Sequence, residues 1–221
     1  MEVVGIDLPV LINPMEKEEK ELFLGRNSNF KVMKHDQVMN EWKDNYYVYV
    51  SDHCEEWLDY IENIPFRKKS TIIHVLMNKS ALNKPISKLI NTTIILPTVY
   101  GPWQPENSVF YKCLNQNQFP FDQYEVEDRS DAIYSSDAAT AILEISKLEH
   151  GVYQVQTDMK DHWNLLLKEL GYEIILDSEK SGYPFFSQTD VKKYKANTKI
   201  SPEVGIEMVK RHIRNREIMG Y

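Results

Sequence analysis

Short apolar runs alternate with charged or amphipathic segments through the first hundred residues of this chain. The apolar runs are rich in β-branched and aromatic residues and predict strands at 2–6, 30–33, 46–50, 71–76 and 92–96. Charged or amphipathic stretches predict helices between them, at 15–24, 53–63 and 81–90. Strands that alternate with helices indicate an α/β fold with a parallel sheet.

The pattern becomes less regular after residue 105. We expect helices at 107–116, 136–147, 161–170 and 202–216, and strands at 152–155 and 173–176. No internal repeat and no low-complexity linker interrupts the chain. The 221 residues can therefore form one large domain, or one domain and a lobe.

Composition excludes several classes of function. A hydrophobic content of 42% with 27% charged residues is typical of a soluble globular protein, and a net charge of −7 argues against a nucleic-acid partner. The first residues lack the features of a signal peptide, and no apolar stretch reaches the roughly 18 residues of a membrane span. Two cysteines, Cys54 and Cys113, do not make a disulfide scaffold, so we expect a reduced, cytoplasmic setting. They have no histidine at metal spacing, so we expect no metal site.

One stretch, Thr98-Val-Tyr-Gly-Pro-Trp-Gln-Pro105, resembles a known family. It is similar to the segment that leads into the substrate half of extended short-chain dehydrogenase/reductases acting on nucleotide sugars, above all UDP-glucuronate 4-epimerases. The resemblance implies an incomplete Rossmann-like parallel sheet in residues 1–100. It implies a small α/β substrate-binding lobe in residues 101–221, with the chain crossing back into the sheet.

The resemblance places the N-terminus within the cofactor half of this family. Val3-Val-Gly-Ile-Asp7 looks like the second Rossmann strand, and Asp7 matches the acidic residue that binds the adenosine ribose of NAD. By this register the first strand, the glycine loop and the first helix are missing. The chain has no Gly-x-x-Gly-x-x-Gly turn to bind the pyrophosphate of NAD, the family's cofactor. A missing central strand would also leave unpaired strand edges.

The family's catalytic pair is a tyrosine followed four residues later by a lysine, which lowers the pKa of the phenol. No tyrosine occurs between Thr71 and Thr98. Ser80 and Lys84 have the required separation, but a serine needs a base of its own. The alternative is that both are ordinary loop residues, which leaves no recognisable catalytic residue.

The substrate half is more complete. Arg129-Ser-Asp-Ala-Ile-Tyr-Ser-Ser-Asp137 resembles the family's R-x-D-F-x-Y-x-x-D stretch, whose arginine contacts the diphosphate of the sugar nucleotide. The alternative is a solvated Arg129 paired with Asp128 or Asp131. Lys180 lies where a second diphosphate-binding arginine is found, and it keeps the charge without the forked geometry.

Three aromatic or apolar residues near the same stretch complete the implied substrate site. Val109 and Phe110 lie where the family lines the pocket for the nucleotide base, and Tyr100 belongs to the motif itself. For all three, the alternative is a packing role in the core.

Three functions follow. The first is an active NAD-dependent nucleotide-sugar 4-epimerase or dehydratase of polysaccharide biosynthesis. The second is a non-catalytic relative, a pseudoenzyme that binds a UDP-sugar through Arg129 and Lys180, as a homodimer or paired with an active paralogue. The third is a decayed gene product without a ligand. The missing motifs favour loss of catalysis over activity, and the sequence leaves the second and third readings open.

Overall fold

The computed structural model describes residues 3–7, 19–20, 30–34, 47–51, 71–77, 90–106, 108–116, 129–172 and 190–220.

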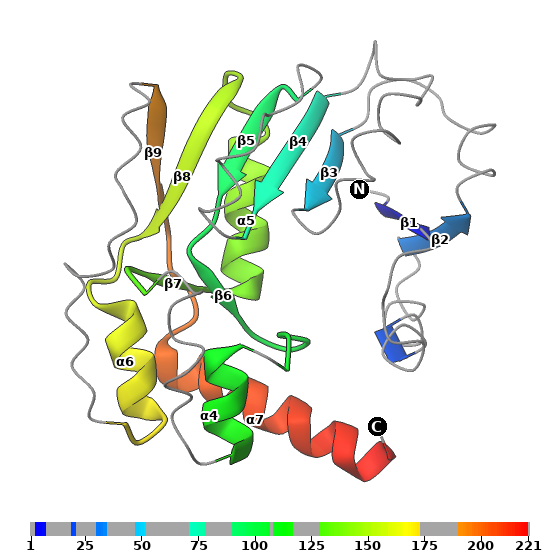
Figure 1. Cartoon of the computed structure of the whole chain (residues 1–221). Helices are drawn as coiled ribbons and strands as arrows, with labels where there is room; N and C mark the ends of the chain where they lie inside the picture. Colours follow the sequence, from blue (N-terminus) through cyan, green and yellow to red (C-terminus); the bar gives the residue numbers. More distant parts are fainter. Residues whose placement is uncertain are drawn as a thin grey trace.

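A five-stranded parallel sheet forms the centre of the molecule (Figure 1). Its strands, in spatial order, are β3 (Tyr47–Ser51), β4 (Thr71–Leu76), β5 (Thr92–Ile95), β8 (Gly151–Thr157) and β9 (Val191–Ala196). Every pair of neighbours in this sheet is parallel. All four residues of β5 are buried, as expected for an inner strand of a parallel sheet. The predicted α/β class is confirmed.

Two further strands form a separate, two-stranded sheet. β1 (Val3–Asp7) and β2 (Phe30–Lys34) pair in parallel with each other. Within the described residues, neither of them pairs with β3 or with any other strand. The described strands of residues 1–96 are thus divided between two sheets, with the break between β1–β2 and β3.

A short parallel pair lies beyond the end of the main sheet. It consists of β6 (Thr98–Tyr100) and β7 (Ala132–Tyr134), with Tyr100 opposite Tyr134. This pairing brings the two motifs singled out in the sequence side by side. Neither strand is predicted by the apolar pattern, because three residues are too few to show a period of two.

Four helices are described in the second half of the chain. They are α4 (Val109–Gln116), α5 (Ser135–Ile145), α6 (His162–Glu169) and α7 (Pro202–Met219). Each coincides with a predicted helix to within about three residues, which is the usual error of helix boundaries. Of the helix predicted at 15–24, only residues 19 and 20 are described, and they are helical. The helices predicted at 53–63 and 81–90 and the strand at 173–176 lie outside the described residues, except that residue 90 is irregular.

One core cluster joins α5 to the main sheet. Ile73, Ile94 and Val155 on the strands pack with Ala138 and Ala141 of the helix. The small alanine side chains allow the helix to approach the sheet closely. α5 therefore covers one face of the sheet (Figure 1).

A second core cluster joins α4, α6 and α7 below the sheet (Figure 1). Its centre is Tyr100, with Phe110 of α4, Trp163 of α6 and Ile206 of α7 around it. A buried carboxylate, Asp137, ties this layer to α5, because its Oδ2 accepts hydrogen bonds from the backbone N–H groups of residues 199 (3.0 Å) and 200 (3.1 Å).

The C-terminal part of α7 forms an ion pair with a residue from near the start of the chain. Arg216 Nε lies 3.0 Å from Oε2 of Glu19, whose side chain is only 6% exposed. Beside this ion pair, the ring of Trp103 contacts His212 at 4.5 Å between centroids, and the Lys20 ammonium lies 5.7 Å from the Trp103 ring centroid. Trp103 has a positive φ of 68°, an uncommon conformation for a bulky residue.

Candidate ligand-binding site

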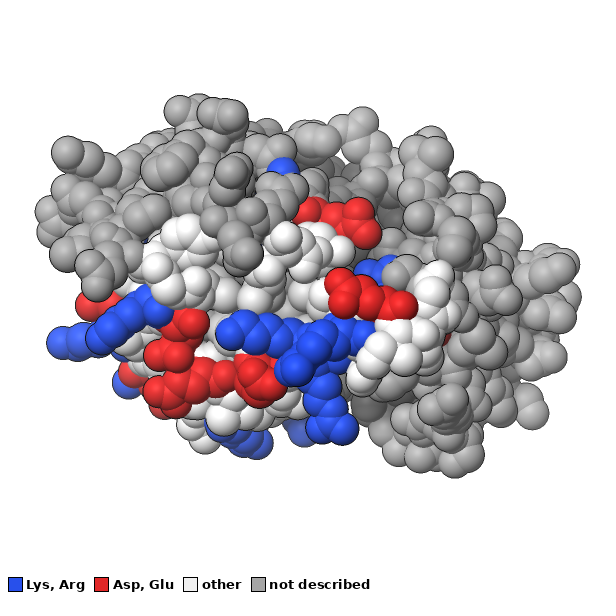
Figure 2. Space-filling model, turned by 90° about the horizontal axis from the view of Figure 1, so that it is seen from below, with Lys and Arg blue, Asp and Glu red and all other residues white. Residues whose placement is uncertain are grey.

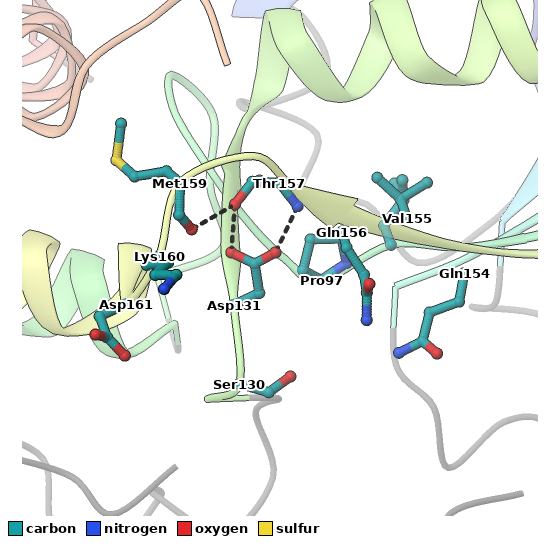
Figure 3. Close-up of a pocket in the computed structure, with 11 residues that line it drawn as sticks. Pro97, Ser130, Asp131, Gln154, Val155, Gln156, Thr157, Met159, Lys160 and Asp161 are labelled. Carbon is teal, nitrogen blue, oxygen red and sulfur yellow. Dashed lines mark hydrogen bonds between the residues drawn. The ribbon is translucent and has the colours of Figure 1, made fainter. Parts of the chain in front are cut away.

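A polar pocket lies at the carboxyl ends of β5 and β8 (Figure 3). In parallel α/β sheets, ligands characteristically bind at this end of the strands. The pocket has a volume of about 240 Å³. Its walls come from the residues after β5, the turn before β7, and the end of β8 with the loop that follows, and they comprise Leu96, Pro97, Ser130, Asp131, Gln154, Val155, Gln156, Thr157, Met159, Lys160 and Asp161.

Asp131 and Thr157 form one wall of this pocket (Figure 3). The Asp131 carboxylate accepts hydrogen bonds of 2.7 Å from both the backbone N–H and the hydroxyl of Thr157. It also accepts one of 2.8 Å from the backbone N–H of Ala132. Burial raises the pKa of Asp131, and these hydrogen bonds oppose the rise because they stabilise the carboxylate. The pair joins the start of β7 to the end of β8.

The loop that follows β8 adds exposed charges to the pocket. Lys160 and Asp161 are both exposed and directly precede α6. Asp161 has a left-handed backbone, with φ 54°, and no side chain caps the first turn of this helix. The pocket thus offers hydroxyl, amide, ammonium and carboxylate groups, a set suited to a ligand rich in hydroxyl groups.

A buried tyrosine–histidine pair lies at the start of the same helix. The Tyr100 hydroxyl and Nε2 of His162 share a hydrogen bond of 3.2 Å. Burial is the largest cause of the raised pKa of Tyr100 and of the lowered pKa of His162, since both charged forms lose hydration. The His162 imidazole is therefore favoured in its neutral form. Its Nδ1 is buried without a hydrogen-bond partner.

The residues singled out in the sequence fall into different surroundings. Tyr100, Val109 and Phe110 are each about 1% exposed and lie together in the second core cluster. Arg129 is half-buried and directly precedes Ser130, which lines the pocket. Arg129 itself is not among the lining residues.

The other candidates are not described with their side chains. Ser80, Lys84 and Lys180 lie outside the described residues, and of Asp7 only the backbone, at the end of β1, is described. Among the described side chains, no three His, Cys, Asp or Glu residues are grouped as a metal ion would require. The described helices include none with the length and apolar character of a membrane span.

Sequence reasoning did not single out several residues of the pocket, among them Gln154, Gln156, Thr157 and Lys160. A usable signal was present, because polar residues at the carboxyl end of a predicted inner strand lie where ligands bind in parallel sheets. The buried position of His162 had no such signal, since it depends on the approach of β6.

The fold is Rossmann-like, and it is similar to that of solved nucleotide-sugar dehydratases and epimerases. The structure resembles dTDP-glucose 4,6-dehydratase from Bacillus anthracis in complex with NAD, with a TM-score of 0.59, 9% identity and coverage of 98% of this chain and 89% of that one. It also resembles UDP-glucuronic acid 4-epimerase from Bacillus cereus in complex with NAD, with a TM-score of 0.53, 16% identity and coverage of 97% and 89%.

The same epimerase in complex with UDP-glucuronic acid and NAD gives a TM-score of 0.51 at 17% identity, covering 97% of this chain and 91% of that one. No protein-family model matches the sequence, and the comparison with curated proteins finds no match. At such identities the likeness establishes the fold and leaves the activity to be argued from the site.

Proposed function

We propose that this chain binds a nucleotide sugar at the pocket beside β5 and β8, without catalysing NAD-dependent hydride transfer. One observation carries the proposal. The turn at residues 129–131, which resembles the substrate half of nucleotide-sugar epimerases, supplies Ser130 and Asp131 to the pocket wall. The segment that resembles a substrate-binding motif therefore forms part of the wall of a cavity. This cavity lies at the end of the sheet where ligands are expected.

The size and chemistry of the pocket fit one part of such a ligand. A volume of about 240 Å³ lies below the range of roughly 300–1,000 Å³ of pockets for drug-sized ligands. A single sugar ring is small enough for it, and Ser130, Gln156 and Lys160 provide groups that can bond sugar hydroxyls. Arg129, next to the pocket wall, and Lys180 supply the charge for the diphosphate.

The positions and pKa shifts of the tyrosines argue against catalysis by this chain. None of the 13 tyrosines in the sequence is followed four residues later by a lysine. Tyr100 and Tyr134 lie in the layer next to the pocket, and burial raises the pKa of both phenols. A tyrosine that acts as a base needs the opposite shift. We therefore assign no hydride-transfer chemistry to this chain, which would act as a pseudoenzyme.

The structural neighbours were solved with NAD bound, but we do not propose NAD binding for this chain. The sequence lacks a glycine-rich turn, and the described glycines with positive φ, at 101, 151, 171 and 220, are widely separated. Without closely spaced backbone N–H groups at a helix N-terminus, the residues present do not fit the pyrophosphate of NAD.

Isothermal titration with UDP-glucuronic acid, UDP-glucose, UDP and NAD tests the proposal. We expect a UDP-sugar to bind more tightly than UDP, and Arg129→Ala to weaken binding at least tenfold. Lys147→Ala, which removes an exposed cation after α5, should leave the affinity unchanged. Gln156→Ala should remove the advantage of the UDP-sugar over UDP.

Two results would overturn this function. NAD binding accompanied by sugar turnover would establish an active epimerase or dehydratase. Failure of every UDP-sugar to bind a folded sample, judged by circular dichroism and cooperative melting, would exclude the nucleotide sugar as ligand.

A further inference from the structure

We infer that two lysines of β9, Lys193 and Lys195, bind the diphosphate of the ligand whose sugar occupies the pocket. The inference rests on the proposed function, because it names the side of the pocket on which the phosphates of that nucleotide sugar lie. The two lysines add a second group of cations to Arg129, which lies on the turn before β7.

The pairing of β8 with β9 places both lysines on the face of the sheet that carries the pocket. Lys193 lies opposite Gln154, and Lys195 lies opposite Gln156. Residues opposite each other in a sheet project from the same face, and so do alternate residues along a strand. Gln154 and Gln156 line the pocket and point to the same side of β8 (Figure 3). Lys193 and Lys195 therefore flank the pocket one strand away, at a strand spacing of about 4.8 Å.

Contacts on both faces of the sheet agree with this register. On the face covered by α5, the Lys192 ammonium lies 5.4 Å from the ring centroid of Tyr153, its partner across the strands. On the other face, the opposite residues Val152 and Val191 pack against the same small group of buried residues. Because side chains alternate between the faces, residues 193 and 195 share the face of Val191.

The charges of both lysines are available to a ligand, since both residues are exposed. Within the described residues, Lys192 forms an ion pair with Glu149 at 3.4 Å, whereas Lys193 and Lys195 form none. Lys195 does act on a nearby carboxylate. Hydrogen bonds from residue 198 are the main cause of the lowered pKa of Asp158, and the charge of Lys195 adds to them. Lys193 therefore carries the less compensated charge of the two.

The charges within the pocket wall direct the phosphates toward β9. Lys160 is followed directly by Asp161, and both belong to the wall, so their charges offset each other. Asp131 is a further carboxylate of the wall. Phosphates near the loop after β8 would thus meet negative charge. On the β9 side, only the neutral amides of Gln154 and Gln156 separate the pocket from the two lysines.

Two cations on one strand suit a diphosphate. Positions two apart on a strand are about 7 Å from each other. The flexible four-carbon stems of Lys193 and Lys195 let both ammonium groups converge on adjacent phosphates. A carboxylate on the sugar would need only one of them. Binding of this kind depends on charge at an exposed site, so it should weaken as salt is added.

The underside of the molecule shows a contrasting surface. Acidic and basic side chains lie side by side there (Figure 2). On α7, for example, Glu207 and Arg214 form an ion pair of 3.0 Å, with side chains 66% and 64% exposed. Cations that are compensated in this way attract an anion weakly. A lysine of this helix, Lys210, therefore serves in a control variant.

Isothermal titration of UDP, UDP-glucose and UDP-glucuronic acid into the full chain tests the inference. Lys193→Ala/Lys195→Ala should weaken all three ligands about tenfold, because each exposed ion pair contributes only a few-fold. Lys193→Arg/Lys195→Arg keeps both charges and should retain most of the affinity. Lys147→Ala/Lys210→Ala removes the same number of exposed cations elsewhere and should leave the affinity unchanged. Added salt should weaken the wild type more than the Lys193→Ala/Lys195→Ala variant.

The possible results separate this inference from the proposed function. Equal affinities of the wild type and Lys193→Ala/Lys195→Ala would overturn the inference and leave the proposed function standing. So would a loss that the control double variant reproduces, because it would reflect net charge alone. A loss confined to UDP-glucuronic acid would place the lysines at the sugar carboxylate and also overturn the inference. Failure of the folded wild type to bind any of the three ligands would overturn both.

Discussion

Gly205 packs against the ring of Tyr100 so closely that a Cβ atom at position 205 would lie 2.8 Å from Cε2 of the tyrosine and 2.9 Å from its hydroxyl. The ring cannot move aside easily, because it has edge-on contacts with Phe110, Tyr134 and His162. The glycine thus sets the distance between α7 and the motif strand β6.

Gly205→Ala should therefore destabilise the protein. Forcing a methyl group into a packed core costs about 1–3 kcal/mol, and the better helix propensity of alanine returns about 1 kcal/mol. We expect a net loss of up to about 2 kcal/mol, measured by urea unfolding. In a Tyr100→Leu background the same substitution should be neutral or stabilising. An increase in stability in the wild-type background would show that the ring yields.

Asp137→Ala should destabilise the protein by about 1–3 kcal/mol, because the buried carboxylate is the acceptor for the backbone N–H groups of residues 199 and 200. Asp158→Ala is the control. Its exposed carboxylate accepts a similar hydrogen bond of 3.1 Å from the N–H of Thr198, where water can replace it. Equal losses in the two variants, measured by thermal unfolding, would contradict a special role for Asp137.

Thr157→Val tests the wall of the pocket. The substitution keeps the branched shape and removes the hydroxyl that donates to Asp131. Since this hydrogen bond lowers the pKa of the carboxyl group against the effect of burial, its loss should raise the pKa of Asp131 further. NMR titration of the carboxyl carbon measures the change, and Thr140→Val, at an exposed hydroxyl of α5, should leave it unaltered.

His162 should make the fold sensitive to acid. Burial lowers the pKa of the folded imidazole below its unfolded value of about 6.5, although Asp131, Asp137 and Asp158 oppose the shift. As the pH falls below that value, the unfolded chain binds a proton before the folded chain does, so stability decreases. The raised pKa of Asp131 acts in the opposite direction at lower pH.

His162→Gln removes this titration and keeps a donor for the Tyr100 hydroxyl. We expect the free energy of unfolding of the wild type to fall more steeply between pH 7 and pH 5 than that of the variant. Urea unfolding at several pH values measures the two slopes. Parallel slopes would show that His162 is protonated as readily in the folded state as in the unfolded chain.

The elements found correctly from the sequence are those with a clear local period. The predicted strand at 71–76 coincides with β4, and the predicted helix at 202–216 coincides with the first 15 residues of α7. β9 was missed because Val191–Ala196 carries three lysines and buries only Ala196 fully, so it does not read as a strand of the core. Tertiary contact, here pairing with β8, decides its conformation.

The site was predictable in part for a different reason. The resemblance at Arg129–Asp137 directed attention to the turn that lines the pocket, yet the two aspartates in it have hydrogen-bonding roles in the fold. Asp131 joins β7 to β8, and Asp137 joins α5 to the residues before α7. Spacing in a sequence does not distinguish a carboxylate that accepts backbone hydrogen bonds from one that faces a ligand, because both need the same residue type.

The ion pair between Glu19 and Arg216 joins residues that are 197 positions apart. Contacts between such distant residues form late, because the entropy of closing a long loop is lost before the contact contributes. During synthesis, the segment around Glu19 leaves the ribosome long before its partner on α7 exists. Glu19 is thus synthesised early and is held by Arg216, which is synthesised late. Until the ion pair forms, the side of Glu19 that is buried in the folded protein is exposed to chaperones and proteases.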